Sequence, residues 1–350
     1  MAKSSDTCAP RSVLVMRFSA LGDVAMTIPA LYPVCRANPD TRFVMLTRPW
    51  PSSMFVDRPD NLEVLGIDVK KECKGIPGLM KLAARLRSEY HIDAVADLHN
   101  VLRTWAIDAS MRLHGIPVVR LDKQRARRKA LVEHKSGELV TPTHDRYLDV
   151  FGQLGLNAPD NFTRLFDGKP MPVSSIVPEK EPGQRWIAVS PFSAHEGKVY
   201  PLDLMKQVIA GLAQRGNYWI FLMGGGKEEK MSCREIAREN RHVVSMAEAK
   251  HGFNDEFALL SKCDLMLTMD SANMHLASLV GLKAVAIWGA TAPACGFLGY
   301  GQSAADDIQL DLPCRPCSIY GERECRYGDY RCLRNIPPGD IVDHVVKIVE

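Results

Sequence analysis

The sequence contains no long run of apolar residues. Its longest apolar stretches, VLVM and AVAIWGA, fall far below the roughly 20 residues that a membrane-spanning helix needs. The N-terminal stretch also lacks the apolar core of a signal peptide, because its short apolar segment is followed at once by Arg17. These absences lead us to expect a cytoplasmic protein without a membrane-spanning segment.

The sequence also lacks a strong charge bias. Its 44 Lys and Arg residues nearly balance its 41 Asp and Glu residues, and the net charge of +3 is too small to indicate a nucleic-acid partner. No complete G-x-G-x-x-G follows a predicted strand, which disfavours a nicotinamide-dependent dehydrogenase. No D-x-D motif is present either, so we expect neither a catalytic metal nor a cofactor.

What the sequence does contain is a repeated alternation of β-rich runs and amphipathic segments. In the first half, residues 12–18, 42–48 and 93–99 are β-rich, and residues 24–37 and 78–90 are apolar at helical spacing. Such alternation predicts parallel sheets with crossover helices. The length of 350 residues suggests two domains.

A proline-rich stretch separates two such blocks. Residues 168–184 combine prolines and charges without periodicity, and the alternation restarts at residue 186. One continuous sheet with a long insertion is the alternative, but loops of that length within a domain are uncommon. We therefore expect Rossmann-like α/β/α domains at residues 1–170 and 171–336, facing each other across a cleft, and a C-terminal helix at 337–350.

Ligands of such sheets bind at the carboxyl ends of the strands, so the loops after the strands are the candidate sites. After the first strand, Gly22 permits a tight turn and Asp23 stands at the start of a helix. Asp23 is either a helix cap or a general base.

Three loops of the second block suit a nucleotide diphosphate. Ser193 and Lys198 precede a helix, as phosphate-binding side chains often do, although an ordinary polar loop has the same composition. Gly225 lies in a run of three glycines that lets backbone approach a ligand, and Glu228 or Glu229 could accept hydrogen bonds from ribose. In the third loop, Asp270 and the five residues after it begin a helix whose amides would face a phosphate. The candidate residues there are Asp270, Ser271, Ala272, Asn273, Met274 and His275.

Two long segments resemble a known family. Residues 13–31, VLVMRFSALGDVAMTIPAL, and residues 270–291, DSANMHLASLVGLKAVAIWGAT, are similar to the two signature regions of glycosyltransferase family 9, the ADP-heptose:lipopolysaccharide heptosyltransferases. Residues 97–104 and 144–156 also resemble segments of that family's acceptor domain. The likeness runs over nearly the whole chain in the family's order.

This resemblance implies a GT-B fold and an inverting, metal-independent transfer of heptose from ADP-heptose to a hydroxyl of a lipopolysaccharide inner-core acceptor. Asp23 matches the family's catalytic base in S-x-x-G-D, and Lys198 matches a lysine on the donor phosphates. Asp270 and His275 match the nucleotide-binding D-[ST]-G-x-x-H loop. The chain departs from that motif at Ala272, where the family usually has glycine and where a Cβ narrows the approach to backbone.

A basic run offers a place for an anionic acceptor. Arg125, Arg127 and Arg128 either form a solvated face or bind the carboxylates and phosphates of a lipid A-core acceptor, with peripheral contact to the inner face of the cytoplasmic membrane. Arg103 is a further acceptor candidate, together with Gly22. Nucleic acid is disfavoured because aromatic residues are not interleaved with the basic ones.

Four cysteines cluster near the C-terminus, at Cys314, Cys317, Cys325 and Cys332. Their C-x2-C-x7-C-x6-C spacing is compatible with structural zinc, with free thiols or with disulfides. Other activities also stay open. They are transfer from another nucleotide sugar to a surface glycan, sugar-nucleotide epimerisation without an acceptor, and donor binding without turnover.

Overall fold

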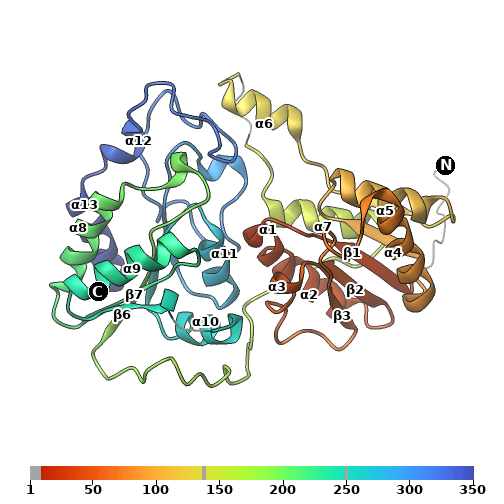
Figure 1. The fold of residues 1–350 in the computed structure, drawn as a ribbon, viewed down its shortest axis with the longest axis horizontal. Helices are drawn as coiled ribbons and strands as arrows, with labels where there is room; N and C mark the ends of the chain where they lie inside the picture. Colours follow the sequence, from red (N-terminus) through yellow and green to blue (C-terminus); the bar gives the residue numbers. More distant parts are fainter. Residues whose placement is uncertain (1–8, 136–138, 249–250) are drawn as a thin grey trace. The chain divides into compact units, whose positions relative to one another are not determined.

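The computed structural model describes residues 9–135, 139–248 and 251–350, which form two compact units (Figure 1). The first unit holds the chain up to Lys123 together with Thr143–Thr163, and the second holds Gln124–Pro142 and Arg164–Glu350. Each unit is built on one five-stranded sheet in which all paired strands are parallel. The α/β architecture expected from the sequence is confirmed.

The first sheet has the strand order β3-β2-β1-β4-β5. Its strands are β1 (Ser12–Met16), β2 (Arg42–Thr47), β3 (Leu62–Gly66), β4 (Ala94–Asp97) and β5 (Val118–Arg120). Its helices are α1 (Leu21–Ala25), α2 (Thr27–Ala37), α3 (Pro49–Ser52), α4 (Gly75–Tyr90), α5 (Leu102–Arg112) and α7 (Thr143–Gln153). All five residues of β1 are buried, as expected for a central parallel strand covered on both faces.

The second sheet repeats this topology with the order β10-β9-β6-β7-β8. Its strands are β6 (Arg185–Ser190), β7 (Tyr218–Leu222), β8 (Val243–Ser245), β9 (Leu265–Met269) and β10 (Ala284–Ile287). Its α-helices are α6 (Arg125–Val132), α8 (Leu202–Ala213), α9 (Lys227–Glu239), α10 (Phe253–Leu260), α11 (Ala272–Leu279), α12 (Arg331–Arg334) and α13 (Pro338–Val349). Short 3-10 turns lie at η1 (Glu196–Lys198), η2 (Met246–Glu248) and η3 (Pro293–Cys295).

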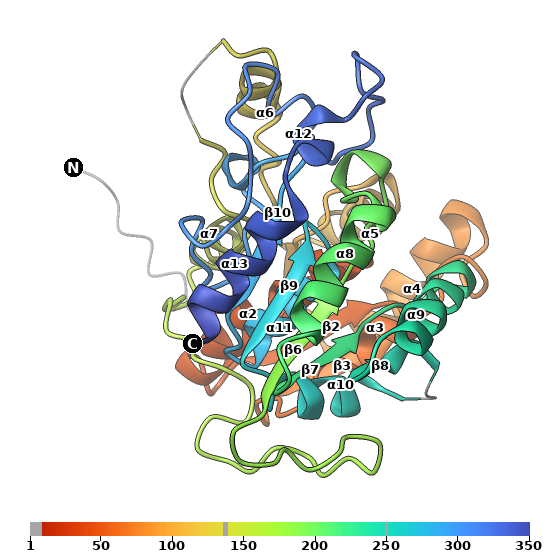
Figure 2. The same cartoon turned by 90° about the vertical axis from the view of Figure 1, so that its left-hand side faces the viewer.

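The C-terminal helix α13 packs beside α8 on the second sheet (Figure 2). Its Ile341 and Val345 belong to the hydrophobic core of the second unit. Among the residues that the structure describes, none of the helices combines the length and apolarity needed to cross a membrane.

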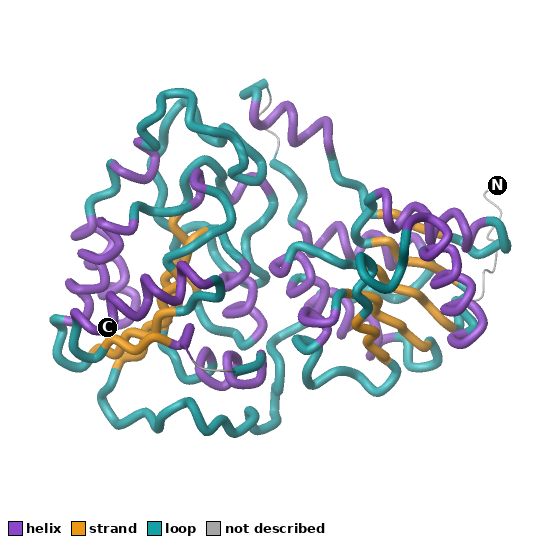
Figure 3. Tube along the Cα trace, viewed as in Figure 1, coloured by secondary structure: helices purple, strands orange, loops and turns teal. Residues whose placement is uncertain are grey.

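The division of the chain differs from a simple split near residue 170. The chain changes unit between Thr163 and Arg164, and residues 154–184 form a long connection without helix or strand (Figure 3). The segment Gln124–Pro142, which the sequence placed in the N-terminal domain, packs with the second unit instead. Its contacts join residues more than 150 positions apart in the chain, so no local pattern could indicate them.

Two buried carboxylates are close neighbours, one at the end of β4 and the other on α5. Asp97 accepts hydrogen bonds from the backbone N–H groups of His99 (2.9 Å) and Asn100 (2.8 Å) and from the Thr104 hydroxyl (2.7 Å). Asp108 on α5 is fully buried and pairs with Arg120 Nε at 2.5 Å. Burial, and then the neighbouring Asp97, raise the pKa of Asp108 to about 7 in spite of Arg120.

This shift makes the stability of the first unit depend on pH. Because the pKa of Asp108 lies above that of an unfolded aspartate (about 3.9), the neutral carboxyl stabilises the fold at acid pH. That contribution is lost as the pH rises through 7.

The Asp108→Asn variant keeps a neutral side chain at every pH. Its melting temperature relative to wild type should therefore increase by a few degrees from pH 5 to pH 8 in thermal unfolding, since about 1 kcal/mol shifts such a domain by roughly 2–4 °C. The exposed Asp311→Asn is the control, and a difference that does not change with pH would contradict the prediction.

Candidate functional site

In each unit one candidate carboxylate lies where the strand order of the sheet reverses. In the first sheet, β1 is flanked by β2 and β4, and in the second, β6 is flanked by β7 and β9. Between β1 and β4, and between β6 and β9, the connecting loops leave toward opposite sides, and open α/β sheets bind their ligands at such points, beyond the carboxyl ends of the strands. Asp23 follows β1, and Asp270 follows β9.

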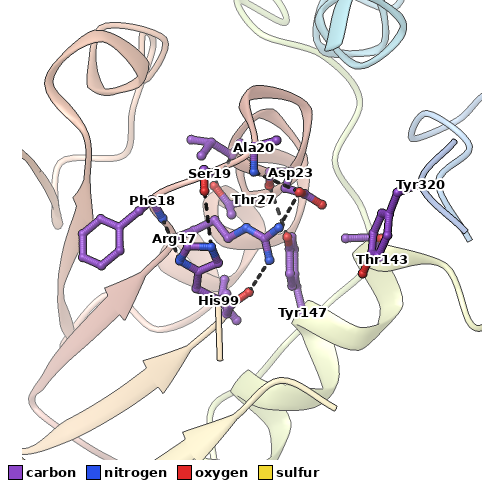
Figure 4. A network of polar contacts seen from close by, with 12 residues as sticks. Arg17, Phe18, Ser19, Ala20, Asp23, Thr27, His99, Thr143, Tyr147 and Tyr320 are labelled. Atoms are coloured by element: carbon purple, nitrogen blue, oxygen red, sulfur yellow. Dashed lines mark hydrogen bonds and ion pairs between the residues drawn. The ribbon is translucent and has the colours of Figure 1, made fainter. Parts of the chain in front are cut away.

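In the first unit, Asp23 forms an ion pair with Arg17 and accepts a hydrogen bond from the Ala20 N–H at 3.0 Å (Figure 4). The second contact caps α1, as the sequence allowed. The Asp23 side chain is 24% exposed, whereas that of Arg17 is 9% exposed. The carboxylate therefore caps the helix and also reaches solvent, so capping and base chemistry do not exclude each other.

Arg17 is a residue that the sequence analysis did not single out. Its guanidinium also donates to the Leu98 carbonyl at 2.7 Å and lies 6.0 Å from the Tyr147 ring, whose hydroxyl donates to the Asp23 carbonyl at 3.2 Å. An arginine directly after a buried strand is the signal that could have identified it, because buried arginines are normally paired.

His99 completes this group from the end of β4. The Phe18 N–H donates to His99 Nδ1 at 3.4 Å, and His99 Nε2 lies 3.4 Å from the Ser19 hydroxyl (Figure 4). Burial, and then the nearby Arg17, lower the pKa of His99 to about 3. His99 is therefore neutral at physiological pH and orients the loop that carries Ser19.

The two acceptor candidates of this unit lie in the helices that follow β1 and β4. Gly22 is buried within α1, and Arg103 is exposed in the first turn of α5, directly after β4. The placement of Arg103 leaves its guanidinium accessible from solvent.

In the second unit, Lys198 and Asp270 form an ion pair of 2.9 Å with side chains only 14% and 5% exposed. Thr291 donates its hydroxyl to the same Asp270 oxygen at 2.8 Å, and the Ser193 hydroxyl donates to the Asp270 carbonyl at 2.9 Å. Asp270 thus holds together the loops that follow β6, β9 and β10. The Lys198 stem packs against Gly321, where the backbone has φ of +79° and where a Cβ would overlap Lys198 Cγ and Cδ.

The start of α11 adjoins this ion pair. Ser271 is the N-cap residue, with its hydroxyl 3.1 Å from that of Thr268, and Ala272 and Asn273 are partly exposed in the first turn. The Asn273 side chain donates to the Ser190 hydroxyl at 2.6 Å. Met274 and His275 are buried, so the His275 side chain in the first turn of α11 is not exposed to solvent.

Two N–H groups of the glycine run already donate to a side chain of the following helix. The Glu229 carboxylate accepts hydrogen bonds from the N–H groups of Gly225 (2.7 Å) and Gly226 (3.3 Å). Glu228 is exposed beside it. The sequence left either Glu228 or Glu229 as a possible acceptor of hydrogen bonds from ribose. Of the two, Glu228 is the one whose carboxylate is not engaged by this loop.

The arginines of the basic run differ in their exposure to solvent. Arg125 and Arg127 are exposed on α6, whereas Arg128 is buried against the rings of Phe297 and Tyr320. Arg128 therefore holds the helix in place and is not presented to solvent.

The four C-terminal cysteines are free thiols. Burial raises the pKa of Cys317, and that of Cys332 to about 11. Within the described part of the chain, no three His, Cys, Asp or Glu side chains are gathered so that they could hold a metal ion.

Arg315 is a second residue that the sequence analysis missed. Its guanidinium donates to the carbonyls of Gly289 (2.5 Å), Trp288 (3.1 Å) and Thr291 (2.9 Å), and also to that of Leu310. These bonds hold the loop that brings Thr291 to Asp270. Arg315 lies between two cysteines in the sequence, and no local pattern there indicates that its hydrogen-bond acceptors lie in distant segments.

Replacement of Arg315 should therefore loosen this loop. Arg315→Met leaves several inward-facing carbonyls without a donor and should destabilise the protein by roughly 1–3 kcal/mol. Arg315→Lys keeps the charge but loses the planar fork, so its effect should be intermediate. Melting temperatures would measure both effects, with the exposed Arg241→Met as control. Equal melting temperatures for Arg315→Met and Arg241→Met would contradict this role.

Comparisons with known proteins agree with this arrangement. Residues 81–329 match glycosyltransferase family 9 (heptosyltransferase). The lipooligosaccharide heptosyltransferase 2 of Campylobacter jejuni is 23% identical over 335 residues, which cover 94% of this chain and 96% of the relative. A family 9 glycosyltransferase from Veillonella parvula has the same fold, with a TM-score of 0.71, 17% identity and 97% of both chains covered. The E. coli ADP-heptose heptosyltransferase II superposes with a TM-score of 0.68 and 16% identity over 97% of this chain and 98% of its own. The chain has two GT-B-type sheets and matches the family over most of its length. It therefore belongs to glycosyltransferase family 9, the heptosyltransferase family.

Proposed function

We propose that this glycosyltransferase transfers a heptose, or a similar sugar, from ADP-heptose to a hydroxyl of a lipopolysaccharide inner-core acceptor. The observation that carries the proposal is the Lys198–Asp270 ion pair of 2.9 Å beside the start of α11, because a lysine and helix amides together suit a diphosphate. Family membership supports the class of reaction. The E. coli relative that acts with ADP-heptose supports the choice of donor.

In this proposal the second unit binds the donor. A lysine ammonium has three N–H donors, and Asp270 accepts only one of them, so Lys198 can be oriented by Asp270 and still bind a phosphate oxygen. The partly exposed Ala272 and Asn273 begin α11, where backbone amides and the helix dipole favour negative charge. Glu228 would accept hydrogen bonds from the ribose, and His275 would support the first turn from inside.

The first unit supplies the base in this proposal. The Asp23 carboxylate would take the proton of the acceptor hydroxyl while that oxygen attacks the anomeric carbon from the side opposite the diphosphate. The sugar is thereby inverted and ADP leaves. Positive charge from Lys198 and the α11 amides would stabilise the departing diphosphate, as preorganised electrostatic groups do. Arg103, Arg125 and Arg127 would bind anionic groups of the acceptor, whose lipid part would bring the enzyme to the inner face of the cytoplasmic membrane.

Asp23→Asn tests the base. Asparagine can still accept the Ala20 N–H, so α1 should keep its cap and ADP binding should stay unchanged. Turnover should fall by about 10²–10⁴-fold, the usual loss when a general base is removed. Steady-state kinetics with ADP-heptose and core oligosaccharide would measure this loss, with the exposed Asp149→Asn of α7 as control. Turnover close to wild type would leave Asp23 with its capping role alone. Donor turnover without any acceptor would instead favour an epimerase.

Lys198→Gln tests the donor site. Glutamine can still donate to Asp270 but carries no charge, and a charge-assisted bond is worth about 1.5–3 kcal/mol. ADP should therefore bind roughly 10–100-fold more weakly in calorimetry. Lys283→Gln is a matched control, because Lys283 pairs with Asp306 at 3.2 Å near the opposite end of the sheet. If both variants bound ADP equally well, the diphosphate would not lie at Lys198.

We also propose that the transfer needs no divalent metal, since Lys198 and the α11 amides supply the positive field and the sequence has no D-x-D motif. Activity should persist after treatment with EDTA. A loss that magnesium or manganese alone restores would refute this proposal. A loss that zinc restores, together with a lower melting temperature, would indicate metal bound by the C-terminal cysteines.

A further inference from the structure

Helix α6 is fixed to the second unit by one of its faces. The Arg128 guanidinium lies 5.5 Å from the Phe297 ring and 5.4 Å from the Tyr320 ring, and it donates to the Tyr320 hydroxyl. Leu131 belongs with Val140, Cys295 and Ile319 to one buried cluster. The opposite face of the helix therefore stays outside, and Lys129 is exposed on it.

The segment from Tyr320 to Arg334 carries a second set of exposed basic side chains. Arg323, Arg326 and Arg334 are exposed, and the Tyr327 ring, 50% exposed, lies between the guanidinium groups of Arg326 (4.8 Å) and Arg331 (4.4 Å). Of the three acidic residues in this segment, Glu324 is exposed and the other two make local contacts. Asp329 pairs with Arg331 at 2.7 Å, and Glu322 accepts hydrogen bonds from the Ser318 hydroxyl and the Tyr320 N–H.

The two sets are neighbours on the same unit. Figures 1 and 2 both show α6 beside the chain that leads into α12. The Glu133 carboxylate lies 2.8 Å from Lys135 and 3.9 Å from Lys129, and its pKa is lowered by Lys135 first and by Arg323 as well. Positive charges from both segments therefore surround the same exposed carboxylate.

The net charge of these two short segments is more positive than that of the whole chain. Residues 125–135 and 320–334 contain nine Lys and Arg residues against four Asp and Glu residues, a net charge of +5, whereas the whole chain has +3. We define the basic face by its exposed side chains. They are Lys129, Lys135, Arg323, Arg326, Tyr327 and Arg334.

We propose that the basic face docks the protein onto an anionic lipid surface. Arginine forks suit lipid phosphates, and an exposed tyrosine held between arginines suits the boundary between headgroups and acyl chains. The basic side chains spread over a helix and a neighbouring loop, which fits a layer of headgroups better than a single small anion. The inference rests on the proposed function in one respect, the expectation that the acceptor is carried by a lipid. It assigns membrane contact to the unit proposed to bind the donor.

Vesicle sedimentation tests the proposal on the full chain without donor. Wild type should bind phosphatidylcholine vesicles that contain phosphatidylglycerol, should bind pure phosphatidylcholine much more weakly, and should be released by salt. The triple variant Arg323→Gln, Arg326→Gln, Arg334→Gln should bind the anionic vesicles about 100-fold more weakly, because each basic residue near such a surface is worth a factor of about five. The pair Lys129→Gln, Lys135→Gln should lose about 25-fold by the same reasoning.

The matched control removes three exposed basic residues from the first unit, with Lys70→Gln, Lys81→Gln and Arg85→Gln. This control should bind anionic vesicles like wild type, and the triple variant of the basic face should keep its melting temperature and its turnover with a lipid-free core oligosaccharide. Equal binding of wild type to both kinds of vesicle, or an equal loss in the control, would overturn the proposal. A comparable loss of turnover with the lipid-free acceptor would also overturn it, because the face would then bind the acceptor itself. Should wild type transfer no sugar to any acceptor, the proposed function would fail while the vesicle result would still decide the docking surface.

Discussion

The buried carboxylate of Asp270 is the constraint around which the second unit is organised. A charge that is 5% exposed must be compensated by a partner and by hydrogen bonds, because desolvation is otherwise too costly. Lys198 supplies the opposite charge, and Thr291 supplies a hydroxyl. These two residues come from loops that follow different strands, so satisfying one side chain fixes the relative positions of three loops.

Much of the surrounding structure serves this arrangement. Arg315 holds the carbonyls around Thr291, the Ala290 N–H donates to the Gly197 carbonyl at 2.7 Å, and Gly321 leaves room for the Lys198 stem. The first unit solves a similar problem on a smaller scale, with Arg17 compensating Asp23 beside the end of β1. In both units, a carboxylate at the carboxyl edge of a parallel sheet is held by a basic side chain, which comes from a different loop in the second unit and from the same β1–α1 segment in the first.

The sequence was most informative where structure follows from local order along the chain. The alternation of strands and helices predicted the two parallel sheets, and the rule that ligands bind at strand ends directed attention to Asp23, Lys198 and Asp270. Contacts between distant segments were not predictable in this way. Arg17 was overlooked because its partners include Leu98, some 80 residues away, and the attachment of α6 to Tyr320 spans 192 positions. The engagement of the glycine amides by Glu229 also escaped prediction, since a first-turn glutamate looks the same whether it caps a loop or faces a ligand.

The attachment of Gln124–Pro142 to the second unit has a consequence for how this protein can be divided. The polypeptide passes between the units three times, after Lys123, after Pro142 and after Thr163, so neither unit is a single uninterrupted stretch of chain. A fragment that begins at Arg164 would lack the helix that covers Cys295 and Ile319, and the rings of Phe297 and Tyr320 would lose their contact with Arg128. The second unit is thus packed from two separate stretches of the chain, and recombination at the long connection between the sheets would separate it from part of its own core.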